Sequence, residues 1–138
     1  MKSRTEWVGD AKFEAVGSRT NEKVLMEGPA NIGGSGEGHS PMEMLVHGVA
    51  GCMSIDIKHI LRHKFDQVEK LVVEVEGERQ EDYPQKFVHL EIKVIVEGDV
   101  AGKDVLRAAE LSRDKYCSAV NSLSAEAEVS AYLNGEKL

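Results

Sequence analysis

The sequence contains two cysteines, Cys52 and Cys117, and these are the residues with the clearest capacity for chemistry. A cysteine acts as a nucleophile through its thiolate, and two thiols that a fold brings together form a dithiol–disulfide couple. The alternative for each cysteine is a small apolar side chain that fills the core. Two cysteines cannot build a four-cysteine zinc site, and we expect no metal and no other cofactor.

Cys52 lies in the middle of an apolar segment with helical spacing, close to Gly48 and Gly51. Glycine inside a helix costs roughly 1 kcal/mol relative to alanine, so these glycines indicate close approach by another backbone or room for a ligand. Asp56, one turn further on, disfavours a thiolate at Cys52, which also lies too deep in the helix for the dipole to help. A reactive Cys52 therefore needs a cation from elsewhere. The candidates are Arg79, Arg19 and Arg62.

Cys117 is expected at or near the start of a second short helix, around Tyr116-Cys117-Ser118. In that position the helix dipole and free backbone N–H groups favour a thiolate, and packing is an equally weighted alternative. Asp56, His59 and His63 share one side of the long helix, a spacing that can ligate a metal. We favour the interpretation that these histidines belong to a solvated last turn.

The elements that position the cysteines follow from periodicity and turn signals. Two short strands meet at a tight turn, Gly9-Asp10, and a third strand covers 23–27. A glycine-rich loop, 28–40, is either a cover over a pocket or a plain connector. It lacks the spacing of a phosphate-binding loop.

Ser40-Pro41-Met42-Glu43 predicts a helix start, with serine as N-cap and Glu43 completing a capping box. The helix is expected over 41–64 and is apolar on nearly every side from Met44 to Ile57. Such a helix must be surrounded by protein. A sheet of the same chain can cover one side, and a second subunit can cover the other.

The rest of the chain predicts a hairpin of two long strands, with alternation over 71–78 and 88–97 and a turn over 80–85. A helix over 102–112 and a last strand over 125–133 follow. The predicted order of elements along the chain is strands, helix, strands, helix and strand. This order predicts an α+β domain with a mainly antiparallel sheet. With 138 residues, we expect one domain over 1–138.

Composition excludes several function classes. A net charge of −7 makes nucleic acid an unlikely main partner, because an acidic surface repels phosphate. No apolar run is long enough to cross a membrane, and the polar start of the chain does not resemble a signal peptide. We therefore expect a cytoplasmic protein whose thiols stay mostly reduced.

Several motifs together resemble the OsmC/Ohr family, most closely its YhfA-like branch. They are Gly33-Gly34, Ser40-Pro41-x-Glu43-x-Leu45, Gly51-Cys52 and Tyr116-Cys117-Ser118. The resemblance extends from Trp7 to Tyr132. It implies an OsmC-like fold, with sheets wrapped around long central helices in an intertwined homodimer.

The resemblance also implies a thiol-dependent peroxidase that reduces organic hydroperoxides, with no cofactor. Cys52 then attacks the peroxide, Cys117 resolves the sulfenic acid to a disulfide, and an external dithiol restores both thiols. The glutamate of the family's peroxidases is replaced by Met42, and Glu43 falls one residue later. Met42, Glu43, Gly48 and Gly51 are the expected pocket residues.

Two other functions remain open at the level of sequence. One is a non-enzymatic dimer that binds an apolar small molecule beneath the glycine-rich loop, with cysteines that have no catalytic role. The other is a redox sensor, which would be oxidised without turnover.

Overall fold

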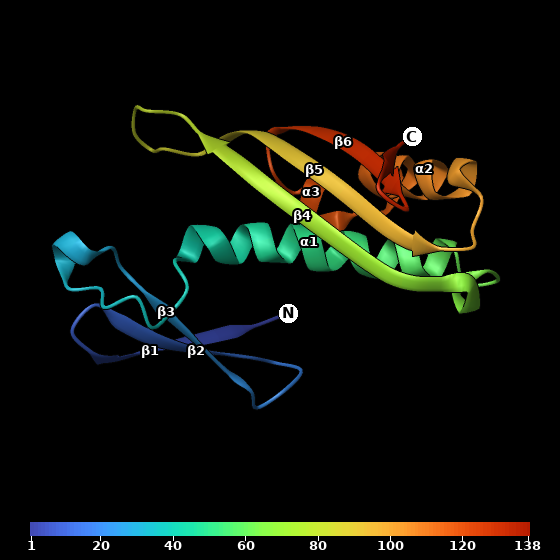
Figure 1. Ribbon diagram of the computed structural model, residues 1–138. Coiled ribbons are helices and arrows are strands. Elements are labelled where there is room, and N and C mark those ends of the chain that lie inside the picture. Colours follow the sequence, from blue (N-terminus) through green and yellow to red (C-terminus); the bar gives the residue numbers. More distant parts are fainter. The chain divides into compact units, whose positions relative to one another are not determined.

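The computed structural model describes residues 1–138 and has the predicted α+β class (Figure 1). The chain forms two compact units, Met1–Leu45 and Val46–Leu138. Helix α1, Pro41–Ile60, begins in the first unit and continues into the second. No helix combines the length and apolar character needed to cross a membrane.

The first unit is a three-stranded antiparallel sheet in the order β1-β2-β3. Its strands are Ser3–Gly9, Lys12–Gly17 and Lys23–Glu27. The predicted turn is confirmed, because Gly9 and Asp10 both have positive φ, at 121° and 46°. Gly9 ends β1 opposite Lys12 of β2, and Asp10 and Ala11 form the two-residue turn between them.

The start of α1 is the predicted capping box. Ser40 Oγ accepts a hydrogen bond from the Glu43 backbone N–H at 3.1 Å, and Glu43 Oε2 accepts one from the Ser40 N–H at 2.7 Å. The predicted end at residue 64 is wrong, because α1 ends at Ile60. Beyond it the bonds tighten to i→i−3, as from Lys64 N–H to the Leu61 carbonyl, and the chain turns through η2, Phe65–Gln67, into β4. Polar residues 62–64 offer no apolar face that would prolong the helix.

The second unit contains a four-stranded sheet in the order β4-β5-β6-β7. The long hairpin is confirmed as β4, Val68–Arg79, paired antiparallel with β5, Phe87–Gly98. The last predicted strand is β6, Glu126–Leu133, and it runs parallel to β5. Strand β7 is only Glu136–Lys137. The sequence pattern did not predict the parallel pair, since alternation shows which face is buried and not which way a strand runs.

The connection from β5 to β6 carries the remaining helices. They are α2, Gly102–Leu111, the single π-helical turn η3, Ser112–Tyr116, and the short α3, Ser118–Asn121. A parallel pair requires such a crossover of a dozen or more residues. This crossover delivers Cys117 to the core.

The core of the second unit lies between the sheet and the helices, and Figure 1 shows α1 running along the sheet. The residues of this core are fully buried. They are Leu90, Ile92, Val94 and Val96 of β5, Val49, Met53 and Ile57 of α1, and Val105, Ala108 and Ala109 of α2. The even-numbered β5 residues lie on one face because strand side chains alternate.

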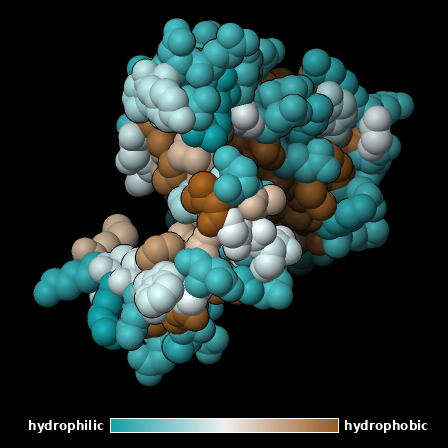
Figure 2. Space-filling model, turned by 90° about the vertical axis from the view of Figure 1, so that its left-hand side faces the viewer, coloured by the Kyte–Doolittle hydropathy of each residue, from teal (hydrophilic) through white to brown (hydrophobic).

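Other apolar residues of α1 remain at the surface. Ile55 is 71% exposed and Leu45 is 44% exposed. Figure 2 shows apolar patches between hydrophilic side chains on the face that it presents. The chain therefore buries one side of the apolar helix and leaves another side uncovered.

Replacement of Met53 by alanine is expected to lower the free energy of unfolding by about 2–5 kcal/mol, because the fully buried side chain would leave a cavity. Urea unfolding followed by circular dichroism measures this change. Tyr83→Ala is the control, since Tyr83 is 91% exposed in the β4–β5 turn. Equal losses in the two variants would contradict the assigned core.

Candidate active site

The two cysteines meet inside the second unit. Cys52 lies on α1, and Cys117 directly precedes α3. The two Sγ atoms and a carboxylate oxygen of Asp56 all lie within 4.8 Å of one another, and the thiols are hydrogen-bonded to each other. Cys52 is half-buried, whereas Cys117 is fully buried. The fold thus brings together two thiols that the sequence separates widely.

Cys117 occupies the predicted helix start, as the N-cap of α3. Its Sγ accepts a hydrogen bond from the Val120 backbone N–H at 3.4 Å. Burial nevertheless raises the pKa of the Cys117 thiol from the usual 9.0 to about 11, and the Val120 bond offsets only part of that effect. The N–H groups at the helix start do favour the thiolate, as expected, but desolvation by burial outweighs them, so the net shift of the Cys117 pKa is upward.

Asp56 is held in place by Ser112. The Ser112 hydroxyl donates a hydrogen bond to Asp56 Oδ2 at 3.0 Å, and Ser112 is fully buried. The Ser112 carbonyl in turn accepts from the Cys117 N–H at 2.8 Å, which closes the π turn. Ser112 thus links the carboxylate to the segment that carries Cys117. Spacing along the sequence gave no signal for this role, since Ser112 and Asp56 lie on different elements.

A cavity of about 280 Å³ opens beside Asp56. Its other lining residues are His59, Ile60, Arg62, Leu111 and Tyr116. Of the three residues in the thiol cluster, Asp56 is the one that lines this cavity.

The three candidate arginines have different surroundings. Arg62 lines the cavity beside Asp56, and its guanidinium donates to the His59 carbonyl at 3.1 Å. The guanidinium of Arg79, at the end of β4, donates to the Gln85 carbonyl at 2.6 Å. Arg19 belongs to the first unit, after β2. Among the three, Arg62 shares a cavity with a residue of the thiol cluster.

The expected pocket residues all lie on the first three turns of α1. A Cβ atom added at Gly48 or Gly51 would meet nothing within 4 Å, so both glycines border open space. Met42 is half-buried, and Glu43 forms the capping box.

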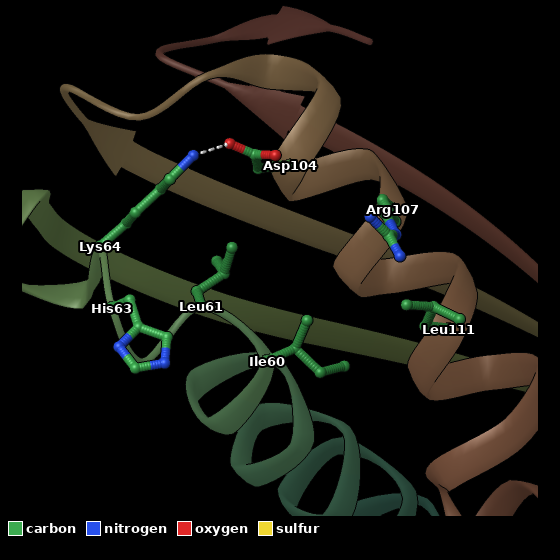
Figure 3. Close-up of a pocket in the computed structure, with 7 residues that line it drawn as sticks. All are labelled: Ile60, Leu61, His63, Lys64, Asp104, Arg107 and Leu111. Atoms are coloured by element: carbon green, nitrogen blue, oxygen red, sulfur yellow. Dashed lines mark hydrogen bonds and ion pairs between the residues drawn. The ribbon is translucent and has the colours of Figure 1, made fainter.

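A neighbouring cavity of about 280 Å³ contains neither cysteine (Figure 3). Lys64 reaches across it to form an ion pair with Asp104 of α2, which keeps the pKa of the Asp104 carboxyl below its usual value. His63 lies in this cavity, whereas His59 lines the cavity beside Asp56. Helical spacing placed Asp56, His59 and His63 on one side of the helix. Because α1 ends before His63, His63 instead lines a different cavity from Asp56 and His59.

The backbone of the glycine-rich loop binds the carboxylate of Glu27, a residue of the same chain. Glu27 is buried, and its Oε2 accepts from the backbone N–H and the hydroxyl of Ser35, at 3.0 and 3.2 Å. Hydrogen bonds from the backbone of Ser35, Gly38 and Gly36 hold the pKa of the Glu27 carboxyl below its usual value. The loop is thus anchored through its own backbone.

These features define an OsmC-like protein: a capped long helix beside an antiparallel-rich sheet, with one cysteine on the helix and one on the crossover. The family model described as OsmC-like protein matches residues 34–131, and the chain belongs to this family. It is similar to Protein YhfA of Escherichia coli K12, with 36% identity over 119 residues, 86% of this chain and 85% of YhfA. The predicted YhfA-like branch is therefore confirmed.

Two solved structures show the same fold. A hypothetical protein from Aquifex aeolicus has a TM-score of 0.82 at 25% identity, over 96% of this chain and 95% of that one. An organic hydroperoxide resistance protein, OsmC, from Legionella pneumophila has a TM-score of 0.65 at 14% identity, over 96% and 94%. The OsmC-like fold expected from the resemblance is confirmed.

Folding stability should fall as pH rises from about 9 to about 11, partly because of Cys117. The folded state keeps the Cys117 proton up to a pKa of about 11, whereas the unfolded chain loses it near 9.0. Since the unfolded state binds fewer protons in this window, raising the pH favours unfolding. Cys117→Ser, which does not titrate there, should show a shallower decline in urea unfolding experiments. Parallel declines would contradict the raised pKa.

Proposed function

We propose that this protein is a thiol-dependent peroxidase that reduces organic hydroperoxides. The observation that carries the proposal is the proximity of the Cys52 and Cys117 sulfurs, within 4.8 Å and hydrogen-bonded. A disulfide requires a sulfur separation of about 2 Å, which side-chain rotation can approach from this starting point. Membership of the OsmC-like family supports the same chemistry.

The different exposure of the two cysteines supports the two proposed roles. Cys52 is half-buried, so it is the more accessible of the two thiols and the one we propose a peroxide reaches. Cys117 is fully buried, which suits a thiol that reacts only with its neighbour. The roles agree with those implied by the family resemblance.

The reaction balances in three steps. The Cys52 thiolate attacks one peroxide oxygen, the O–O bond breaks, and the alcohol leaves with a proton, which gives a Cys52 sulfenic acid. The Cys117 sulfur then attacks the Cys52 sulfur, water leaves, and a disulfide forms. An external dithiol reduces the disulfide and is itself oxidised.

Ionisation of Cys52 requires a nearby cation, since Asp56 lies within 4.8 Å of its sulfur. We propose Arg62 for this role, because it lines the cavity that reaches Asp56. A guanidinium stays charged at every physiological pH and can serve both the carboxylate and a developing thiolate.

The setting that fits this activity is the cytoplasm during oxidative stress, where thiol reductants are available. The relative from Legionella pneumophila is named for organic hydroperoxide resistance. We extend that substrate class to this chain as part of the proposal.

Reduced protein mixed with cumene hydroperoxide should lose both thiols and form one intramolecular disulfide, which a dithiol then reverses. Cys52→Ser should abolish the fast thiol loss, because the accessible nucleophile is gone. Cys117→Ser should stop at a sulfenic acid that a dimedone probe traps. Thiol titration and mass spectrometry measure these outcomes.

The matched control for this experiment is Asp82→Asn, which removes an exposed carboxylate in the β4–β5 turn and should react like the wild type. Thiol loss in the wild type that is no faster than in Cys52→Ser would refute the peroxidase. Oxidation that no dithiol can reverse would instead indicate the redox sensor.

We further propose that the functional unit is a homodimer in which α1 packs against a second copy. The uncovered side of α1 carries Ile55 and Leu45, with Gly48 and Gly51 between them. These residues recur at spacings of three and four and lie on one helical face, and the glycines allow close approach of another helix. Burial of this face is the expected contribution of the partner.

Ile55→Glu is expected to shift the protein from dimer to monomer, because burying an unpaired carboxylate at the interface is unfavourable. Sedimentation velocity measures the mass in solution. Tyr83→Glu, at an exposed turn, should leave the dimer unchanged. A wild-type monomer, or a dimer that tolerates Ile55→Glu, would overturn the proposal.

One observation supports the alternative of apolar ligand binding. The first unit contains a cavity of about 450 Å³ beneath the glycine-rich loop, with Phe13, Met26 and Ile32 among its lining residues. Its volume falls within the range of small-molecule sites. Unreactive thiols in the native protein, together with a co-purified apolar compound, would favour this function.

A further inference from the structure

We propose that Cys52, Asp56 and Cys117 form a binding site for a thiophilic divalent cation such as Zn²⁺. Two sulfurs and one carboxylate oxygen lie within 4.8 Å of one another and can converge on one ion. The donor set suits zinc, which binds thiolate, imidazole and carboxylate ligands. Such a site goes beyond the peroxidase reaction, in which the same groups need no metal.

The separations are close to those of a tetrahedral centre. Zinc binds sulfur at roughly 2.3 Å and carboxylate oxygen at roughly 2.0–2.2 Å, so tetrahedral ligand atoms lie about 3.5–3.8 Å apart. The three donor atoms already lie within 4.8 Å. Because Cys52 and Asp56 are one turn apart on α1, small side-chain rotations are enough to bring the donors together.

Two of the three donor groups already accept hydrogen bonds of the kind that ligands of a metal site accept from neighbouring residues. The Ser112 hydroxyl donates to Asp56 Oδ2 and orients the carboxylate. The Val120 N–H donates to Cys117 Sγ and stabilises negative charge on that sulfur. Outer partners of this kind fix ligand orientation in known metal sites.

Charge explains why a cation would be favoured here. Two thiolates and a carboxylate oxygen within 4.8 Å of one another would crowd three negative charges in a small space. A divalent cation neutralises most of that charge, and its binding releases thiol protons. Of the three donors, Asp56 lines a cavity of about 280 Å³.

Metal binding and peroxide reduction would exclude each other, since both use the same sulfurs. A bound ion would protect the dithiol from oxidation, and formation of the disulfide would remove two of its three ligands. Metal binding itself requires only the reduced protein.

The test uses the full chain, reduced and stripped of metal with a chelator, under anaerobic conditions. Titration with Zn²⁺ against a chromophoric chelator should give one site per chain, and Co²⁺ should give a thiolate charge-transfer band with a tetrahedral spectrum. Cys52→Ser and Cys117→Ser should lose that band. Ser112→Ala should weaken Zn²⁺ binding by roughly 10–100-fold, as expected for an outer partner.

Asp56→Asn separates the proposed site from simple binding by a dithiol, because it keeps the shape of the side chain and removes the anionic ligand. It should weaken Zn²⁺ binding, whereas Asp82→Asn should bind like the wild type. Unchanged affinity in Asp56→Asn, or wild-type affinity no higher than in Cys52→Ser, would overturn the proposal. Peroxide reactivity measured in excess chelator is independent of these results, so failure of the metal site and failure of the peroxidase are distinguishable.

Discussion

The arrangement of the thiol site depends on one part-buried contact, the hydrogen bond from the Ser112 hydroxyl to Asp56 Oδ2. It joins α1 to the single π-helical turn, and the same turn is closed by the Cys117 N–H bond to the Ser112 carbonyl. Ser112 is fully buried and Asp56 half-buried, so each satisfies a polar group of the other that burial partly removes from water. The contact therefore both satisfies Asp56 and sets the position of the Cys117 backbone against Cys52.

Burial has two consequences for the dithiol. It raises the pKa of Cys117 to about 11, which favours the protonated thiol at neutral pH. It also keeps Cys117 next to the more accessible Cys52, where it can respond once its neighbour is oxidised. In the two proposals, Cys117 loses its proton when its sulfur bonds either to an oxidised Cys52 or to a cation between the donors. The proposed peroxidase and the proposed metal site are thus two responses of one buried cluster.

Helix α1 has two sides that differ in exposure. Val49, Met53 and Ile57 are fully buried within the chain, whereas Ile55 stays largely exposed. A helix that is apolar all round is stable in water only when protein covers it all round. The proposed second copy of the chain would meet that requirement, and it would place an interface close to Gly51 and therefore near Cys52.

The sequence by itself determined most local elements: the Gly9-Asp10 turn, the Ser40–Glu43 capping box, the long β4–β5 hairpin and the start of a helix at Cys117. Each of these depends on neighbours within a few residues, so its signal is present in the chain. The resemblance in two cysteine motifs also indicated the family. Only the tertiary structure decided the parallel pairing of β6, the end of α1 at Ile60, the role of Ser112 and the protonation of Cys117. These features depend on burial and on contacts between residues far apart in the sequence, which local spacing does not encode.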